Sequence, residues 1–158
     1  MVEHLVNAYL SEPQYIYAHR CHRILLGTDG KPIPYNKWAW ERSFATEQQA
    51  SHRLFATGCG GVLYPPKILA KEALNEALFK EICPYADDVW WKAMALLNDT
   101  RIKMVYSHDA HGNDFLINDA IQDVGLRTIN VDGEALNDKQ IADVFSHFNL
   151  YPKLQDEE

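Results

Sequence analysis

Apolar residues recur every three or four positions in several stretches of the chain. This spacing places each set on one face of a helix. The pattern predicts helices over 2–11, 71–82 and 87–98, and a final helix that is capped by Asn137. Three of these apolar sets are Val2, Leu5, Val6 and Leu10; Leu74, Leu78, Phe79 and Ile82; and Ile141, Val144, Phe145 and Phe148.

Shorter apolar runs between these helices have the composition of strands. Strands are predicted over 15–18, 23–26 and 101–106, and the turn sequence 27–30, followed by two prolines, predicts a hairpin after the second strand. Residues 55–64 predict a short strand interrupted by glycine, whereas 38–54 follow no clean period and fit either a loop or a weak helix. The order of elements predicts one α/β domain over 1–151, a mixed sheet with helices on both faces, and a frayed acidic tail over 152–158.

Composition narrows the class of protein. The chain has 158 residues, of which 47% are hydrophobic, and its formal net charge is −7, so no nucleic-acid partner is expected. No apolar run is long enough for a membrane span and the start lacks a secretory signal, which predicts a cytoplasmic protein. The three cysteines, Cys21, Cys59 and Cys83, lack CxxC spacing and are interpreted as free buried thiols.

Two adjacent carboxylates, Asp87 and Asp88, begin the predicted helix over 87–98. Backbone N–H groups and the helix dipole favour ionised carboxylates there, so one interpretation of the pair is a structural cap. A carboxylate that is ionised at neutral pH can also act as a general base. The glycine-rich stretch 57–66 precedes the pair, and its glycines allow the backbone to approach a ligand closely, which favours function over capping.

Several segments together resemble one known family. Residues 57–66 read Thr-Gly-x-Gly-Gly-Val-Leu-Tyr-Pro-Pro and 86–98 read Ala-Asp-Asp-x-Trp-x-Lys-Ala-Met-Ala-Leu-Leu-Asn. His-Arg-x-His-Arg-Ile at 19–24, Tyr-Asn-x-Trp at 35–38 and Asn-Asp-Lys-Gln at 137–140 agree in the same order. Over about residues 14–145 the chain resembles bacterial nucleotide-sugar glycosyltransferases of the GT-A type.

The resemblance implies a partial GT-A-like fold and a function. The chain corresponds to the acceptor-side half, and the reaction is transfer of a sugar, as by a hexosyltransferase, from a nucleotide-sugar donor to a hydroxyl of a surface polysaccharide or lipid-linked glycan. Asp88 is the implied base and Asp87 orients it or the acceptor, although two neighbouring carboxylates can exchange these roles. The candidate substrate-binding residues are Gly58, Gly60, Gly61, Tyr64, Trp90, Trp91, Arg20, His22 and Arg23.

The metal belongs to the part of such enzymes that this chain does not match. Their N-terminal half binds the nucleotide and ends in an Asp-x-Asp run that holds Mn²⁺ or Mg²⁺, and the first ten residues here resemble the helix after that run. The resemblance therefore implies a divalent metal in the complete enzyme and none for this chain alone, which could be inactive by itself. His108 and His111, with Asp109 and Asp114, are the weaker local candidates for metal ligands.

Other interpretations of the same residues remain open. The cluster over 19–23 fits either a solvated strand face or a site in which Arg20 and Arg23 bind a diphosphate or a carboxylate. Trp90 and Trp91 lie about 100° apart on a helix, so one is expected in the core and the other on a sugar ring. For the whole chain, the alternative functions are a non-catalytic carbohydrate- or partner-binding module and an inactive truncated enzyme. The possible protein partners are a second copy of the chain, in a homo-oligomer, or a separate N-terminal half that the chain completes.

Overall fold

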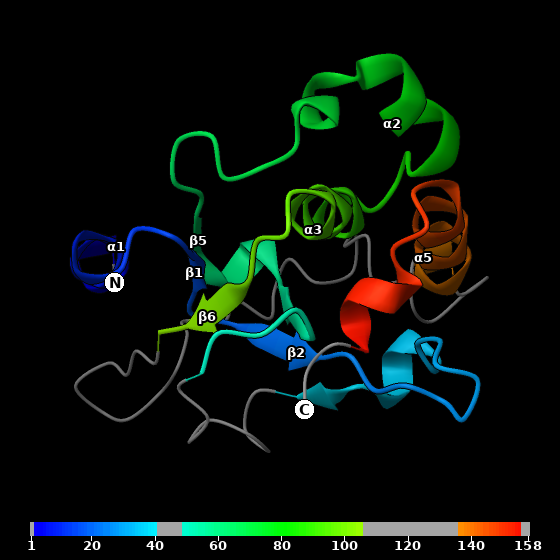
Figure 1. Ribbon diagram of the computed structural model, residues 1–158, viewed down its shortest axis with the longest axis horizontal. Coiled ribbons are helices and arrows are strands. Elements are labelled where there is room, and N and C mark those ends of the chain that lie inside the picture. The colour runs from blue at the N-terminus through cyan, green and yellow to red at the C-terminus, as the bar shows by residue number, and fades with distance from the viewer. Residues whose placement is uncertain (1, 41–48, 106–135, 156–158) are drawn as a thin grey trace, which may run out of the picture.

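The computed structural model describes residues 2–40, 49–105 and 136–155, and shows an α/β protein in which helices flank two small sheets (Figure 1). Its helices are α1 (Val2–Ser11), α2 (Glu76–Ile82), α3 (Asp87–Leu97) and α5 (Leu136–His147). Its strands are β1 (Ile16–Ala18), β2 (Cys21–Arg23), β3 (Ala39–Trp40), β4 (Leu54–Ala56), β5 (Val62–Leu63) and β6 (Ile102–Met104). Four short 3-10 turns are η1 (Tyr35–Lys37), η3 (Gly58–Gly60), η4 (Lys71–Leu74) and η6 (Tyr151–Leu154).

Each sheet has three strands. The first has the order β5-β1-β6, with β5 antiparallel and β6 parallel to β1, so it is mixed. The second has the order β3-β2-β4 and both of its pairings are antiparallel. A two-residue bridge between Ser51 and Ile102 joins the segment before β4 to β6 and holds the sheets together.

Within the described residues, the chain crosses between the two sheets twice. His19 and Arg20 lead from β1 into β2, and residues 57–61 lead back from β4 to β5. Both crossings consist of two to five residues, so they are too short to leave the sheets. The place where they meet carries the candidate site described below.

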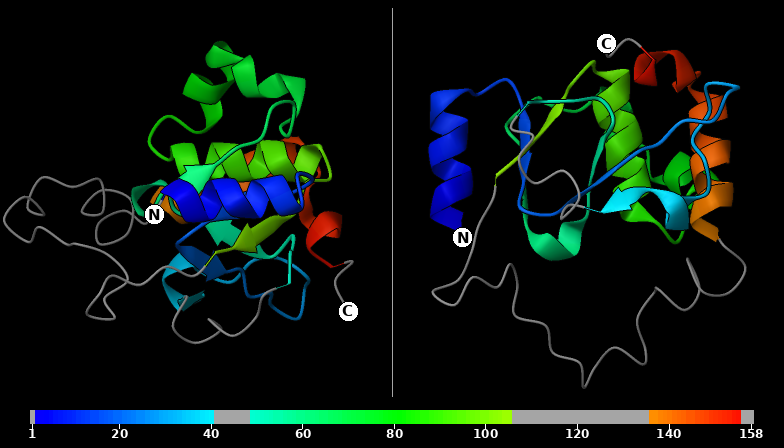
Figure 2. Two further views of the ribbon diagram at one scale, coloured as in Figure 1. Left: turned by 90° about the vertical axis from the view of Figure 1, so that its left-hand side faces the viewer. Right: turned by 90° about the horizontal axis from the view of Figure 1, so that it is seen from below.

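Helix α3 connects the two clusters of buried side chains. Trp90 and Met94 pack with α5, β4 and η6 residues in the larger cluster, whereas Ala95 joins β1, β4 and β6 in the smaller one. Figure 2 shows α1 beside the first sheet and α5 along α3, in agreement with the contacts of α1 with β1 and β5 and of α3 with α5. None of the helices in the described ranges is long and apolar enough for a bilayer crossing.

The end of the chain differs from the prediction of a frayed tail. Residues 151–154 form η6, Leu154 is fully buried in the larger cluster, and its carbonyl accepts a hydrogen bond from Arg53 Nε at 2.7 Å. The sequence signal failed because one leucine among polar residues has no period. Only residues 156–158 of this tail lie outside the described part.

Three smaller predictions also need correction. The helix expected over 71–82 is two elements, because Asn75 interrupts it and caps α2 by accepting a hydrogen bond from the Leu78 N–H at 3.1 Å. Helix α5 begins at Leu136, so Asn137 lies inside its first turn and not at the cap. All three cysteines are free, as predicted, but Cys59 is exposed while Cys21 and Cys83 are buried.

Candidate functional site

The glycine-rich segment forms a tight turn on the β1–β2 connection. Thr57 N–H donates to the Arg20 carbonyl at 3.1 Å, and His19 N–H donates to the Gly61 carbonyl at 3.2 Å. Gly60 lies directly against Arg20, and a Cβ at that position would overlap with the Arg20 Cβ. Gly61 has φ +90°, in the region that favours glycine. The turn therefore needs glycine at two positions for two separate reasons.

Asp88 meets this turn from the first turn of α3. Its Oδ1 accepts a hydrogen bond from the Gly58 N–H at 3.0 Å, across thirty residues of sequence. Ala86 is the N-cap of α3 and makes no side-chain capping bond. The Asp88 carboxylate is thus used to join α3 to the glycine turn and not to cap its own helix.

The surroundings of Asp88 make its carboxyl group less acidic than usual. Burial is the main cause and raises its pKa to about 6, with the neighbouring Asp87 charge adding to the effect. The Gly58 hydrogen bond and the Arg20 guanidinium act in the opposite direction. Asp87 itself is exposed. The pKa of the Asp88 carboxyl group therefore lies closer to neutral pH than is usual for an aspartate.

Two tyrosines, Tyr64 and Tyr35, lie close enough to Asp88 for its charge to affect their pKa values. Tyr64 is 37% exposed, and burial of its hydroxyl and the charges of Asp88 and Asp87 raise its pKa. Burial and the Asp88 charge also raise the pKa of Tyr35 to about 12. Both phenols consequently stay protonated at neutral pH and can donate a hydrogen bond to a ligand oxygen.

Arg20 lies between the glycine turn and an exposed aromatic ring. Its Nη1 donates to the Cys59 Sγ at 2.9 Å, and its guanidinium carbon is 5.6 Å from the centre of the Trp40 ring. Guanidinium groups favour the face of an indole ring. Arg20 therefore places a positive charge beside Asp88 while it is held on two sides.

The histidine of the same cluster is inside the protein. His22 is only 2% exposed, and its ring centre lies 4.3 Å from that of Trp40 and 5.6 Å from that of Tyr35. Burial, with the nearby Arg20 charge, lowers its pKa to about 4, so it is neutral at physiological pH. Arg23 lies at the other end of β2, paired in register with Ala39 and Leu54. The solvated strand face is therefore not observed for this cluster, since His19 is also buried.

The two adjacent tryptophans have different surroundings. Trp90 is 1% exposed and its Nε1 donates to the Ala73 carbonyl at 3.2 Å, which makes it a core residue. Trp91 is partly exposed, and its ring centre lies 6.1 Å from that of Tyr64. Trp91 and Tyr64 therefore offer partly exposed aromatic surface, whereas Trp90 does not.

The candidate metal ligands are not tested by the described residues. His108, Asp109, His111 and Asp114 all lie outside them. Within 2–40, 49–105 and 136–155, no group of three or more His, Cys, Asp or Glu side chains is arranged to hold a metal ion.

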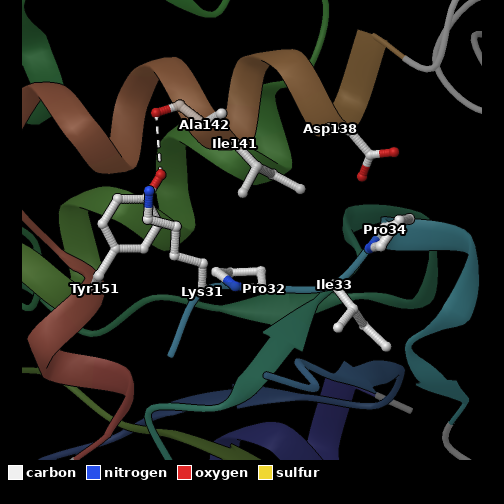
Figure 3. A pocket seen from close by; sticks show the side chains of 8 residues that line it. All are labelled: Lys31, Pro32, Ile33, Pro34, Asp138, Ile141, Ala142 and Tyr151. Carbon is white, nitrogen blue, oxygen red and sulfur yellow. Dashed lines mark hydrogen bonds between the residues drawn. The ribbon is translucent and has the colours of Figure 1, made fainter. Parts of the chain in front are cut away.

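A groove lies between α5 and the segment over 31–34. Figure 3 shows Ile141 on α5 pointing toward the segment that carries Pro32 and Ile33, with Lys31 over the Tyr151 ring, 5.4 Å from its centre. Asp138 closes one end and accepts a hydrogen bond from the Tyr35 N–H at 2.7 Å. The groove contains none of the sequence-predicted site residues; it is lined by Lys31, Pro32, Ile33, Pro34, Asp138, Ile141, Ala142 and Tyr151.

The structure thus brings together Gly58, Gly60, Arg20, Tyr64 and Asp88, and separates Trp90 and Arg23 from them. Sequence reasoning missed Tyr35, Cys59 and Trp40 as neighbours of this site. Tyr35 could have been found, because it belongs to one of the segments on which the resemblance in the sequence analysis rests. Cys59 and Trp40 carry no comparable signal.

The chain was compared with protein-family models, curated proteins and solved structures. No protein-family model, no curated protein and no solved structure matches the chain.

Proposed function

We propose that the chain forms the acceptor side of a glycosyltransferase, with Asp88 as the general base. The observation that carries the proposal is the state of the Asp88 carboxyl group: it is half-buried, its pKa is about 6, and Gly58 holds one of its oxygens. A base with a pKa slightly below the working pH is ionised and still accepts a proton effectively. The motif resemblance given above supplies the reaction class.

In the proposed reaction Asp88 takes the proton of an acceptor hydroxyl. The acceptor oxygen forms a bond to the anomeric carbon of the donor sugar, and the bond from that carbon to the diphosphate oxygen breaks. The leaving nucleoside diphosphate keeps the electron pair, and the proton stays on Asp88 until water removes it. This sequence is a single in-line displacement and inverts the configuration at the anomeric carbon.

The remaining site residues support the acceptor in this scheme. Tyr64 and Trp91 provide partly exposed aromatic surface, on which the apolar face of a sugar ring can pack. Protonated Tyr64 and Tyr35 can donate to sugar oxygens, and Arg20 offsets the charge of ionised Asp88. A divalent metal, where the complete enzyme binds one, would stabilise the charge of the leaving diphosphate.

The test is replacement of Asp88 by asparagine, both in this chain alone and in this chain joined to a nucleotide-binding half. Uridine, guanosine and thymidine diphosphate sugars are offered with Mn²⁺ and glycan acceptors, and the labelled product is quantified. Asp88→Asn is expected to lower the rate by about two to four orders of magnitude, since loss of a general base has that effect. Asp87→Asn is expected to lower it less, because exposed Asp87 acts only on its neighbour.

A matched control removes a carboxylate elsewhere. Asp143→Asn deletes an exposed charge on α5 that pairs with Lys139, and is expected to leave transfer unchanged. Near-normal turnover of Asp88→Asn would exclude this residue as the base. Glycan binding that survives Asp88→Asn, with no transfer by either protein, would favour the rival proposal of a non-catalytic carbohydrate-binding module.

A further inference from the structure

The hydrogen bond between Gly58 and Asp88 distinguishes the two carboxylate oxygens. Oδ1 accepts from the Gly58 N–H at 3.0 Å, while Oδ2 accepts from no residue in the described part of the chain. A carboxylate with one oxygen fixed cannot rotate freely about its last bond. The second oxygen is then presented in one direction.

The Gly58 N–H is itself held in place from both sides. The Gly61 N–H donates to the Gly58 carbonyl at 3.0 Å and the Gly60 N–H to the Thr57 carbonyl at 3.0 Å, so the turn is closed on itself. Thr57 N–H is bonded to the Arg20 carbonyl at 3.1 Å, which ties the turn to the β1–β2 connection. The donor is therefore part of a rigid turn and does not follow a movement of the carboxylate.

We propose that Gly58 is a positioning residue for the reaction: its N–H fixes Oδ1 of Asp88 and thereby leaves Oδ2 as the atom that takes the acceptor proton. This inference rests on the proposed role of Asp88 as base. It gives Gly58 a function different from direct contact with a sugar.

The same geometry makes a side chain at position 58 unfavourable for the Asp88 contact. An added Cβ would lie 3.0 Å from Oδ1, closer than a carbon and an oxygen normally approach. An alanine there would push the carboxylate away from the N–H that should hold it. Other groups that face Asp88 supply only charge or a distant phenol: Asp87 on α3, Arg20 between β1 and β2, Tyr35 in η1, and Tyr64 after β5.

The first experiment uses the wild-type protein and needs no substrate. Amide spectra recorded between pH 4 and 8 are expected to show the Gly58 N–H shifting with the titration of Asp88, with a midpoint of about 6. In Asp88→Asn this shift is expected to disappear. A Gly58 amide that does not move between pH 4 and 8 in the folded wild-type protein would overturn the proposal.

The second experiment compares two glycines with the same local geometry. In Gly58→Ala the new methyl meets Asp88 Oδ1, and in Gly27→Ala it meets Asp29 Oδ1, both at 3.0 Å. Gly58→Ala is expected to raise the Asp88 titration midpoint, because the ionised form loses its donor, and to lower transfer about ten- to a hundredfold. Gly27→Ala is expected to change neither.

The two proposals fail in different ways. If Asp88→Asn abolishes transfer but the Gly58 amide does not titrate with Asp88, the positioning role is wrong and the base remains. If the amide titrates with Asp88 while Asp88→Asn transfers normally, the positioning contact exists without the reaction, and the proposed function is wrong. An unchanged Asp88 midpoint and unchanged transfer in a folded Gly58→Ala would also contradict the positioning role.

Discussion

Asp88 and the glycines around it show how single residues acquire their roles from distant parts of the chain. A glycine-rich stretch in a sequence predicts a turn or a close approach, but not which neighbour requires it. Here Gly60 is required by Arg20, forty positions earlier, and Gly58 lies against Asp88, thirty positions later. These requirements depend on tertiary packing, which no local pattern contains.

Gly60→Ala is expected to destabilise the protein by about 1–3 kcal/mol, as overpacking of a rigid site does. The atoms that the new methyl meets are the Arg20 Cβ and backbone, which cannot rotate away. Urea unfolding measures the change, and Gly27→Ala serves as the control because its methyl meets the end of the flexible Asp29 side chain. A loss of stability no larger than that of Gly27→Ala would contradict the packing described for the turn.

At the scale of elements, helices with one clear apolar face could be predicted from the sequence. Helix α1 has the predicted bounds because Pro13 follows it, and α3 starts at Asp87 as expected. The stretch over 71–82 shows the limit of this reasoning. Its apolar spacing continues through Asn75, but the asparagine side chain competes for the backbone N–H groups and starts a new helix.

Strands of two or three residues were predicted less well. The chain over 38–54 contains β3 and the first residue of β4, although its sequence has no clean period. Such short strands are stabilised by their partners more than by their own residues. The division into two sheets could not be predicted for the same reason, since it depends on pairings between distant segments.

The candidate site was predictable in composition but not in arrangement. The acidic pair and the glycine stretch were found because each stands at a recognisable place, a helix start and a turn. The hydrogen bond that joins them, and the burial that shifts the Asp88 pKa, arise from packing between α3 and the two crossings.

The η6 turn is expected to contribute measurably to stability, contrary to its polar sequence. Leu154→Ala should lower the free energy of unfolding by about 2–5 kcal/mol, as for other buried leucines. Leu74→Ala is the matched control, because Leu74 is 89% exposed while Leu154 is fully buried. Equal stability of the two variants in urea would show that the end of the chain does not pack as described.

At the scale of the whole molecule, the site occupies the junction between the sheets. The connection through Arg20 and the turn over 57–61 both pass from one sheet to the other, and α3 points its first turn at them. In the part of the chain that the structure describes, each sheet alone has three short strands. Contacts of the site therefore help to hold this junction, beside the bridge between Ser51 and Ile102, so stability and function are coupled here.

This coupling predicts that the protein becomes more stable when Asp88 is neutralised. Its pKa is raised from the usual 3.8 to about 6, so the folded state holds a proton more tightly than the unfolded state. The stability that the bound proton provides is lost as the pH rises from about 4 to 6, and the full cost of ionised Asp88 is present above pH 6. Asp88→Asn should raise Tm at pH 7–8, by about 2–4 °C for each kcal/mol relieved, and have little effect near pH 4.

The control for this prediction is a carboxylate whose replacement should change Tm in the opposite direction. The hydrogen bond from Lys153 and the charge of Lys153 lower the pKa of Asp99. Ionised Asp99 therefore stabilises the folded state at pH values above the usual pKa of an aspartate. Asp99→Asn is expected to lower Tm slightly at pH 7, because the pair is exposed. Calorimetry at pH 4 and 7 measures both variants, and a lower Tm for Asp88→Asn at pH 7 would contradict the burial of its charge.

The pH dependence of transfer tests the central claim most directly. For the acceptor, kcat/KM reports the ionisation of the free enzyme. If Asp88 is the base, kcat/KM should be constant above pH 7 and fall about tenfold per pH unit below a midpoint of about 6, the Asp88 pKa. Circular dichroism at each pH confirms that the protein stays folded. A kcat/KM that remains constant down to pH 5 in the folded protein would contradict the assignment of Asp88 as the base.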